Sequence, residues 1–322
     1  MSLLGGRHDD RAQLFDELAT MLDAGLPVSK AVEHAAERRG GPYRALADVV
    51  ADGRPLSEAM AAQGAMFTAF ERRLVTAGER SGDLPRVLAR LGAHHAGRGK
   101  LRAGLLGGIA YPVILLHLAV LLPNFKVLFF DGLFAYAGVV VPPIAIGWGL
   151  VALVVFGLRG LGVGQATRVA FHRAILAVPV LGSLNQKLAL ADLADALGLL
   201  YGAGVPVREA MAGAADACSN AAIGDAVARA GRGIDEGLDL AGSLRLAQPL
   251  VPRLFIDLVE TGEKTGKVDE MLAKAESVYR EQAERASGLI VKLVPVAVFL
   301  LVAAYIGYIV ISSYVQLYSG LL

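Results

Sequence analysis

The chain of 322 residues is 55% apolar and only 19% charged, and its formal net charge is +1. This near-neutral balance excludes a polyanion-binding surface based on bulk charge, so we expect no nucleic-acid partner. The single cysteine, Cys218, excludes an internal disulfide framework and a cysteine-rich zinc site.

Charged side chains are concentrated in two blocks, residues 1–103 and 159–288. Outside these blocks the only charged residues are Lys126, Asp131 and Lys292. In a soluble enzyme, charged residues are not confined to two separate blocks of the sequence. The distribution therefore predicts a membrane protein with two water-facing domains.

The first block has the periodicity of helices and no β-type alternation. Apolar residues at helical spacing from Leu14 to Leu22 predict a first helix, and Gly25 stands where a helix often ends. Further helices are expected near residues 29–39, 42–53, 56–62 and 68–77, and from residue 84 onward. The last of these could continue into the membrane.

Three segments carry no charge: residues 103–125, 132–158 and 293–322. Because about 20 apolar residues suffice to cross a bilayer, each segment is long enough to be a membrane span. The alternative for any one of them is a buried helix of a soluble domain. The expected spans lie near Gly104–Leu122, Ala137–Leu158 and Leu293–Ile311.

Basic residues precede the first and third spans and follow the second, whereas the loop 123–136 carries one lysine. The positive-inside rule therefore places both charged blocks and the N-terminus in the cytoplasm, and the short loop and C-terminus outside. We expect four parts: a cytoplasmic helical domain (1–103), two transmembrane helices with a short exterior loop (104–158), a second cytoplasmic helical domain (159–288), and a third transmembrane helix with an exterior tail (289–322).

The two charged blocks are similar to each other. Residues 24–28, AGLPV, recur as AGVPV at 203–207, an offset of 179, and residues 74–82 recur at 258–266, an offset of 184. We interpret this as a duplication, in which each copy leads into a membrane helix with a proline near its cytoplasmic end. The expected fold is all-α: an integral membrane protein with three transmembrane helices and two homologous cytoplasmic six-helix bundles. In the second copy, helices are expected near residues 207–217, 239–245 and 250–261, and from residue 268 onward.

Residues 160–187 do not recur in the first copy. The stretch from Thr167 to Val178 is basic and amphipathic and could lie along the membrane surface. Residues 178–183 then form the expected turn into the second domain.

A glycine-bounded motif occurs once in each copy, as GERSG at residues 78–82 and as GEKTG at residues 262–266. The second occurrence looks at first like a phosphate-binding loop. However, it has one residue too few between its glycines, it follows a helix, and Val268 stands where Ser or Thr must bind magnesium. We therefore do not expect nucleotide binding.

Both motifs are better explained as turns between helices. In each, the first glycine can end a helix and the second permits the chain to reverse. Two interpretations stay open for the glutamates: a capping or solvated carboxylate, or a contact to another helix or a partner. The residues of this candidate contact site are Gly78, Glu79, Gly82, Gly262, Glu263 and Gly266.

No residue pattern indicates catalysis, a cofactor or a metal, so we do not expect an enzyme. His94 and His95 are adjacent, cannot form an i, i+4 metal pair, and are expected on the surface. His117 lies in the first span, where we expect a helix–helix contact rather than a proton relay. No carboxylate lies in any expected span.

Several short motifs occur in a characteristic order: residues 14–28, GRPLSEAM at 53–60, the two glycine-bounded turns with Leu84 and Val268, AYPV at 110–113, and PVLG at 179–182. In this order they resemble the type II secretion system protein F family, the inner-membrane platform proteins of type II secretion and type IV pilus machines. The resemblance covers about residues 12–312. One departure is residues 237–244, where the second copy lacks the L-S-E-A element.

The resemblance implies a non-catalytic platform in the bacterial inner membrane. It would couple a cytoplasmic hexameric secretion or pilus ATPase to extraction and polymerisation of pilin or pseudopilin subunits. The implied contacts also include other inner-membrane assembly proteins, membrane lipid, and further copies of the chain in a homo-oligomer. The alternative function belongs to a different class: the chain would be a subunit of an oligomeric transporter or channel.

The first span contains small residues that would allow close helix approach, although glycines that face lipid are the alternative. The residues expected in this transmembrane packing are Gly104, Gly107, Gly108, Tyr111 and Pro112.

Overall fold

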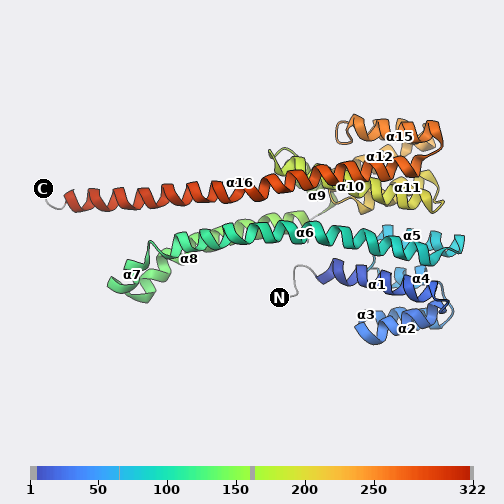
Figure 1. Cartoon of the computed structure of the whole chain (residues 1–322), viewed down its shortest axis with the longest axis horizontal. Coiled ribbons are helices and arrows are strands. Elements are labelled where there is room, and N and C mark those ends of the chain that lie inside the picture. The colour runs from blue at the N-terminus through green and yellow to red at the C-terminus, as the bar shows by residue number, and fades with distance from the viewer. Residues whose placement is uncertain (1–5, 65, 160–163, 320–322) are drawn as a thin grey trace. The chain divides into compact units, whose positions relative to one another are not determined.

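The computed structural model describes residues 6–64, 66–159 and 164–319, and these residues form helices and connections without a β-strand (Figure 1). The prediction of an all-α chain is confirmed. The chain divides into two compact units. The helical-core unit comprises Met1–Arg102 and His172–Glu284, and the membrane unit comprises Ala103–Phe171 and Arg285–Leu322.

The first copy lies in the helical-core unit. Its helices are α1 (Gly6–Asp23), α2 (Val28–Arg39), α3 (Pro42–Ala51), α4 (Leu56–Ala62), α5 (Ala69–Ser81) and the start of α6 (Leu84–Leu121). The local sequence explains where several of these helices begin or end. Pro42 occupies the first turn of α3, and Thr68 caps α5 in a capping box with Glu71. Gly25 and Gly53 have the positive φ values that end α1 and α3.

The second copy repeats this order with one addition. Its helices are α10 (Leu181–Gly202), α11 (Val207–Ala217), α12 (Ala221–Ala230), α13 (Arg232–Asp235), α14 (Leu240–Arg245), α15 (Arg253–Thr265) and the start of α16 (Val268–Ser319). Four residues, 52–55, connect α3 to α4, whereas nine, 231–239, connect α12 to α14. The short helix α13 lies in this longer connection and accounts for the change of the repeat offset from 179 to 184.

Both copies contribute to one hydrophobic core. Leu74 of α5, Leu88 of α6 and Leu197 of α10 are among its fully buried side chains. Helix α5 of the first copy packs against α10 and α11 of the second. On this side, Arg73 Nη1 lies 2.9 Å from Asp216 Oδ2, so an ion pair also joins the two copies.

Helices α6 and α16 are the two long helices of Figure 1, with 38 and 52 residues. Each begins in the helical-core unit and continues without interruption into the membrane unit. The expectation that the last helix of each copy runs on into the apolar segment is therefore confirmed.

The membrane unit also contains α7 (Phe125–Phe130), α8 (Gly132–Arg159) and the start of α9 (Gln165–Leu176). Two described helices are long and apolar enough to cross a membrane, over Gly132–Leu153 in α8 and within Val268–Tyr308 in α16. In α6 the described apolar stretch is shorter, Tyr111–Leu121, so the span expected at Gly104–Leu122 stays a prediction.

Helices α9 and α10 would add a further span only if they crossed the membrane as one bent pair, with an angle of 119° between them. Helix α10 buries Leu190, Leu193 and Leu197 in the helical core. We therefore assign α10 to the helical-core unit and not to a membrane span.

Candidate functional site

The glycine-bounded turns have the same backbone geometry in both copies. Gly82 has a φ of 72° and ends α5, and its N–H donates to the carbonyl of Glu79 at 3.4 Å. Asp83 N–H donates to the carbonyl of Gly78 at 3.0 Å. This is a Schellman arrangement, and Gly266 repeats it in the second copy with a φ of 70°.

The first glycine of each motif does not end a helix, contrary to expectation. Gly78 and Gly262 lie inside α5 and α15, which continue to Ser81 and Thr265. A Cβ at Gly78 would lie 3.0 Å from Val87 Cβ, and one at Gly262 would lie 2.8 Å from Val268 Cα. These glycines therefore let each helix pack closely against the helix that follows it.

The motif glutamates cap a short helix of their own copy. Glu79 accepts hydrogen bonds from Ser57 N at 3.3 Å and from Ser57 Oγ, at the start of α4. Glu263 accepts from Leu240 N at 2.7 Å and Ala241 N at 2.9 Å, at the start of α14. Each carboxylate thus satisfies N–H groups at a helix N-terminus, where the helix dipole also favours negative charge. Of the two interpretations, this geometry favours the capping carboxylate.

An open groove of about 650 Å³ lies beside the first motif, between α4 and α5, and we call it the α4–α5 groove. Three arginines line it, Arg72, Arg73 and Arg80, together with Ser57 and Glu79. Arg73 and Arg80 also line a neighbouring pocket of about 330 Å³ that includes residues 203–206 of the second copy. The capping glutamate therefore lies at the edge of a basic surface.

The prediction that His94 and His95 lie on the surface is wrong, because both are buried in the helical-core unit. His95 Nε2 lies 2.7 Å from Glu71 Oε1, and its ring stacks on Phe15 with centroids 5.7 Å apart. His94 Nδ1 lies 2.5 Å from Asp195 Oδ2 of α10, so it links the first copy to the second.

A sequence signal for this burial exists. Leu84, Leu88, Leu91 and His95 recur at helical spacing, which places His95 on the apolar face of α6. Adjacent residues of a helix lie about 100° apart. Both histidines are nevertheless buried because α6 has helices of both copies around it.

Glu71 is the centre of a buried ionic cluster. It accepts hydrogen bonds from Arg11 Nη1 at 2.8 Å, from His95, and from the backbone and hydroxyl of Thr68. Burial alone would raise the pKa of Glu71. The hydrogen bond from His95 and the charge of Arg11 outweigh burial and lower this pKa below its ordinary value.

His95 has its pKa lowered chiefly by burial, although Glu71 acts in the opposite direction. The pair therefore fits a neutral imidazole whose Nε2–H donates to an ionised carboxylate. A buried group of this kind holds α1, α5 and α6 together rather than offering a reactive side chain.

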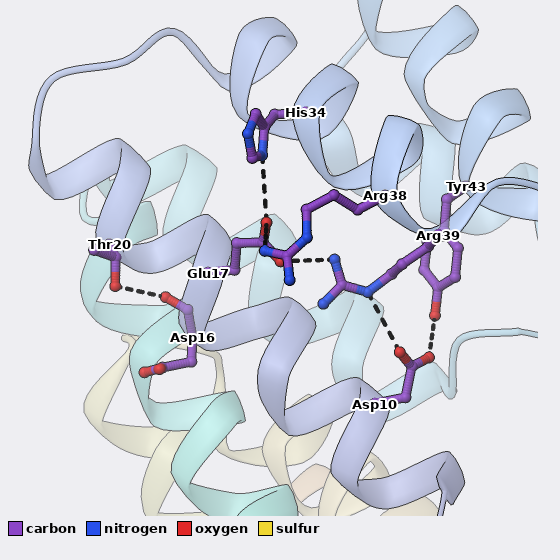
Figure 2. A network of polar contacts seen from close by, with 8 residues as sticks. All are labelled: Asp10, Asp16, Glu17, Thr20, His34, Arg38, Arg39 and Tyr43. Carbon is purple, nitrogen blue, oxygen red and sulfur yellow. Dashed lines mark hydrogen bonds and ion pairs between the residues drawn. The ribbon is translucent and has the colours of Figure 1, made fainter.

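A second polar network joins α1, α2 and α3 on the outside of the first copy (Figure 2). Arg39 donates to Glu17 at 2.7 Å and to Asp10 at 3.3 Å, and Tyr43 Oη donates to Asp10 at 2.8 Å. Burial would raise the pKa of Glu17, but Arg39 and Arg38 lower it below the ordinary value.

In the same network, the pKa of Tyr43 is raised rather than lowered. Burial and the hydrogen bond to Asp10 raise its pKa to about 12.

His117 makes the helix–helix contact that we expected. Its Nε2 accepts a hydrogen bond from Trp148 Nε1 of α8 at 3.1 Å, and its Nδ1 lies 2.7 Å from the carbonyl of Val113. Both ring nitrogens therefore have partners within α6 and α8, as a polar side chain among apolar helices requires.

The expected transmembrane packing residues have different surroundings. A Cβ at Gly108 would lie 2.5 Å from Val291 Cγ2, so α6 and α16 approach closely there. A Cβ at Gly107 would meet nothing within 4 Å. Pro112 is buried and Tyr111 is exposed, while the surroundings of Gly104 lie outside what the structure describes.

Among the described residues, no group of three or more His, Cys, Asp or Glu side chains could hold a metal ion. The residues of the two glycine-bounded motifs have structural roles. Their glycines form turns and close helix contacts, and their glutamates cap helices. The fold thus defines a class: an all-helical membrane protein with two or three candidate spans and a duplicated helical region.

The family comparison identifies this class more closely. The model of the family "Type II secretion system (T2SS), protein F" matches the chain twice, over residues 14–130 and 193–316. The two matches coincide with the two copies, and the chain belongs to this family.

Curated relatives come from two kinds of machine. The chain is similar to a type 4 fimbrial assembly protein PilC of Pseudomonas putida, with 31% identity over 96% of this chain and 83% of the relative. It is also 30% identical to a type II secretion system protein F of Xanthomonas campestris pv. campestris, over 95% of this chain and 82% of that protein. A type IV pilus assembly protein PilC of Pseudomonas aeruginosa is 25% identical over 99% of this chain and 93% of its own length.

Proposed function

We propose that this protein is a non-catalytic inner-membrane assembly platform of a type II secretion or type IV pilus machine. It couples a cytoplasmic hexameric ATPase to the extraction and polymerisation of pilin or pseudopilin subunits. The observation that carries the proposal is the double match of the secretion family model, one match for each helical copy. The names of the relatives, which divide between secretion and pilus assembly, support the same role.

The proposed topology has three spans, with the N-terminus and both helical domains in the cytoplasm and the C-terminus outside; the second domain has seven helices rather than the expected six, because α13 is added. The two continuous helices α6 and α16 support it, because each joins water-facing helices directly to an apolar segment. A continuous helix of this kind suits a protein that transmits a movement from the cytoplasm into the membrane.

We further propose that the α4–α5 groove is the contact for the ATPase. Arg72 and Arg80 line this open groove, and the Glu79 cap fixes the adjoining helix α4. Three arginines and two carboxylates, Glu58 and Glu79, give the lining an excess of positive charge that would attract an acidic surface.

Charge reversal tests this assignment. We expect Arg72→Glu/Arg80→Glu to reduce secretion or piliation roughly tenfold or more while membrane insertion persists, because like charges would then face the acidic partner. Lys264→Glu is the matched control, since Lys264 corresponds to Arg80 in the second copy and lies in α15. Equal losses in both variants, or no loss in either, would exclude the groove as the contact.

A further inference from the structure

A pocket of about 680 Å³ lies in the second copy, lined by residues of α9, α12, α13 and the segment before α15. Three arginines from three different helices line it: Arg173 of α9, Arg229 of α12 and Arg232 of α13. We call it the α12–α13 pocket. All of its lining residues belong to the helical-core unit.

The charges in this pocket favour an anion. Glu236 is the one carboxylate of the lining, against three guanidinium groups. Arg229 pairs with Asp225 one turn earlier on α12. Within the part of the chain that the structure describes, neither Arg173 nor Arg232 has an ion-pair partner.

The rest of the lining is apolar. Leu246, Pro249 and Leu250 form part of the wall, and Leu246 is 59% exposed. A free inorganic anion would use only the arginines. A ligand with a phosphate next to hydrocarbon would use both parts of the pocket, because the arginines bind phosphate and the apolar side chains bury acyl chain.

Along the chain, this pocket is close to the membrane unit. Helix α9 carries Arg173, and the boundary between the two units falls inside this helix, after Phe171. The pocket is also an addition to the repeat, since α13 lies in the longer connection that the first copy lacks. The helical fold of the first copy therefore forms without it.

The structure assigns the α12–α13 pocket to an anionic phospholipid, with the phosphate bound by Arg173 and Arg232 and hydrocarbon against Leu246 and Leu250. Basic pockets beside membrane helices on the cytoplasmic side are suited to such headgroups. The bound lipid would fix the second copy to the membrane surface at α9. This site is distinct from the α4–α5 groove, so each assignment stands or fails separately.

The test uses the full chain in phosphatidylethanolamine vesicles that contain a photoreactive phosphatidylglycerol with its reactive group near the phosphate. After illumination, mass spectrometry maps the lipid adducts. We expect adducts on residues 226–250, and Arg173→Gln/Arg232→Gln should reduce them roughly tenfold or more, since each charge contributes to headgroup binding. Adducts on α8 serve as the internal control and should not change.

Matched variants separate this site from general surface charge. Arg72→Gln/Arg80→Gln removes two arginines from the other groove and should leave the adducts in place, and Arg173→Lys/Arg232→Lys should restore most of them. Equal loss in all three variants would overturn the proposal. A photoreactive phosphatidylcholine that labels residues 226–250 equally well would overturn it too, and competition by millimolar glycerol phosphate would assign the pocket to a soluble anion instead.

Discussion

At the scale of single residues, the motif that is most distinctive in the sequence has a structural role in both copies. Glu79 and Glu263 stand in equivalent positions and cap equivalent helices, although one bonds a serine and the other two backbone N–H groups. A glutamate can accept hydrogen bonds from either set of donors, because in both copies it faces a helix N-terminus whose N–H groups lack a partner within the helix.

Loss of a cap should weaken the domain without preventing membrane insertion. We expect Glu263→Ala to lower the free energy of unfolding by about 1 kcal/mol, the usual effect of removing a side chain that caps a helix. Thermal unfolding of the purified protein in detergent measures this. Glu33→Ala is the control, because its exposed ion pair with Lys30 contributes little. Equal stability of the Glu263→Ala variant and the wild type would contradict the capping role.

The buried pair of Glu71 and His95 makes stability depend on pH. The pKa of His95 is lowered, so its contribution is present above its ordinary value of 6.5 and is lost as the pH falls below it. The pKa of Glu71 is also lowered, so its contribution is present above 4.5 and is lost as the pH falls from there through the folded value. Arg11 and His94 also face this pair, and their charge disfavours the protonated form of His95.

We therefore expect the unfolding temperature to decrease on acidification in two stages, the first beginning near pH 6.5. His95→Gln should flatten the first stage, since the amide can donate to Glu71 without titrating. His34→Gln, at an exposed position of the outer network, should leave it unchanged. A wild-type profile that is flat between pH 7 and pH 5 would contradict this account.

At the scale of helices, much of the fold follows from local patterns. The apolar periodicity predicts α2 and α11 within a residue or two, and the uninterrupted helical pattern from residue 84 predicts the continuous α6. Helix α13 was not predicted, because a four-residue helix has too little periodicity to be recognised. The cluster of Arg11, Glu71 and His95 could not be predicted either, because it joins residues up to 84 positions apart.

Glycines differ in ways that only the packing reveals. The sequence groups Gly107 with Gly108, but only Gly108 lies close to α16. Likewise, the sequence pattern predicts helix ends at Gly78 and Gly262, but both glycines lie inside helices. Because a glycine has no Cβ, the next helix can pack closely against each of them. A glycine at a helix end and a glycine at a close contact look the same without the neighbouring helix.

The adjacent glycines provide a matched test of the α6–α16 contact. We expect Gly108→Ala to destabilise the protein by about 1–3 kcal/mol through overpacking against Val291. Gly107→Ala should be neutral or slightly stabilising, because its Cβ has open space and alanine favours the helix. Thermal unfolding in detergent compares the two, and Gly108→Ala/Val291→Ala should recover most of the loss. Equal effects of the two single variants would exclude the close contact.

At the scale of the whole molecule, the duplication organises the protein. Each copy continues through one long helix into the membrane unit, and the two copies share one core through α5, α10 and α11. The family model matches the same two parts of the chain. The copies differ in their surfaces, with the arginine-lined α4–α5 groove in one and the α12–α13 pocket in the other.

In-membrane crosslinking with mass spectrometry in the native cell tests whether the protein is an assembly platform. We predict crosslinks from residues 1–103 or 159–288 to a cytoplasmic secretion or pilus ATPase, and from the membrane helices to a pilin-like subunit. Crosslinks only between copies of this chain, together with solute flux through vesicles that contain the purified protein alone, would contradict the platform and indicate a channel.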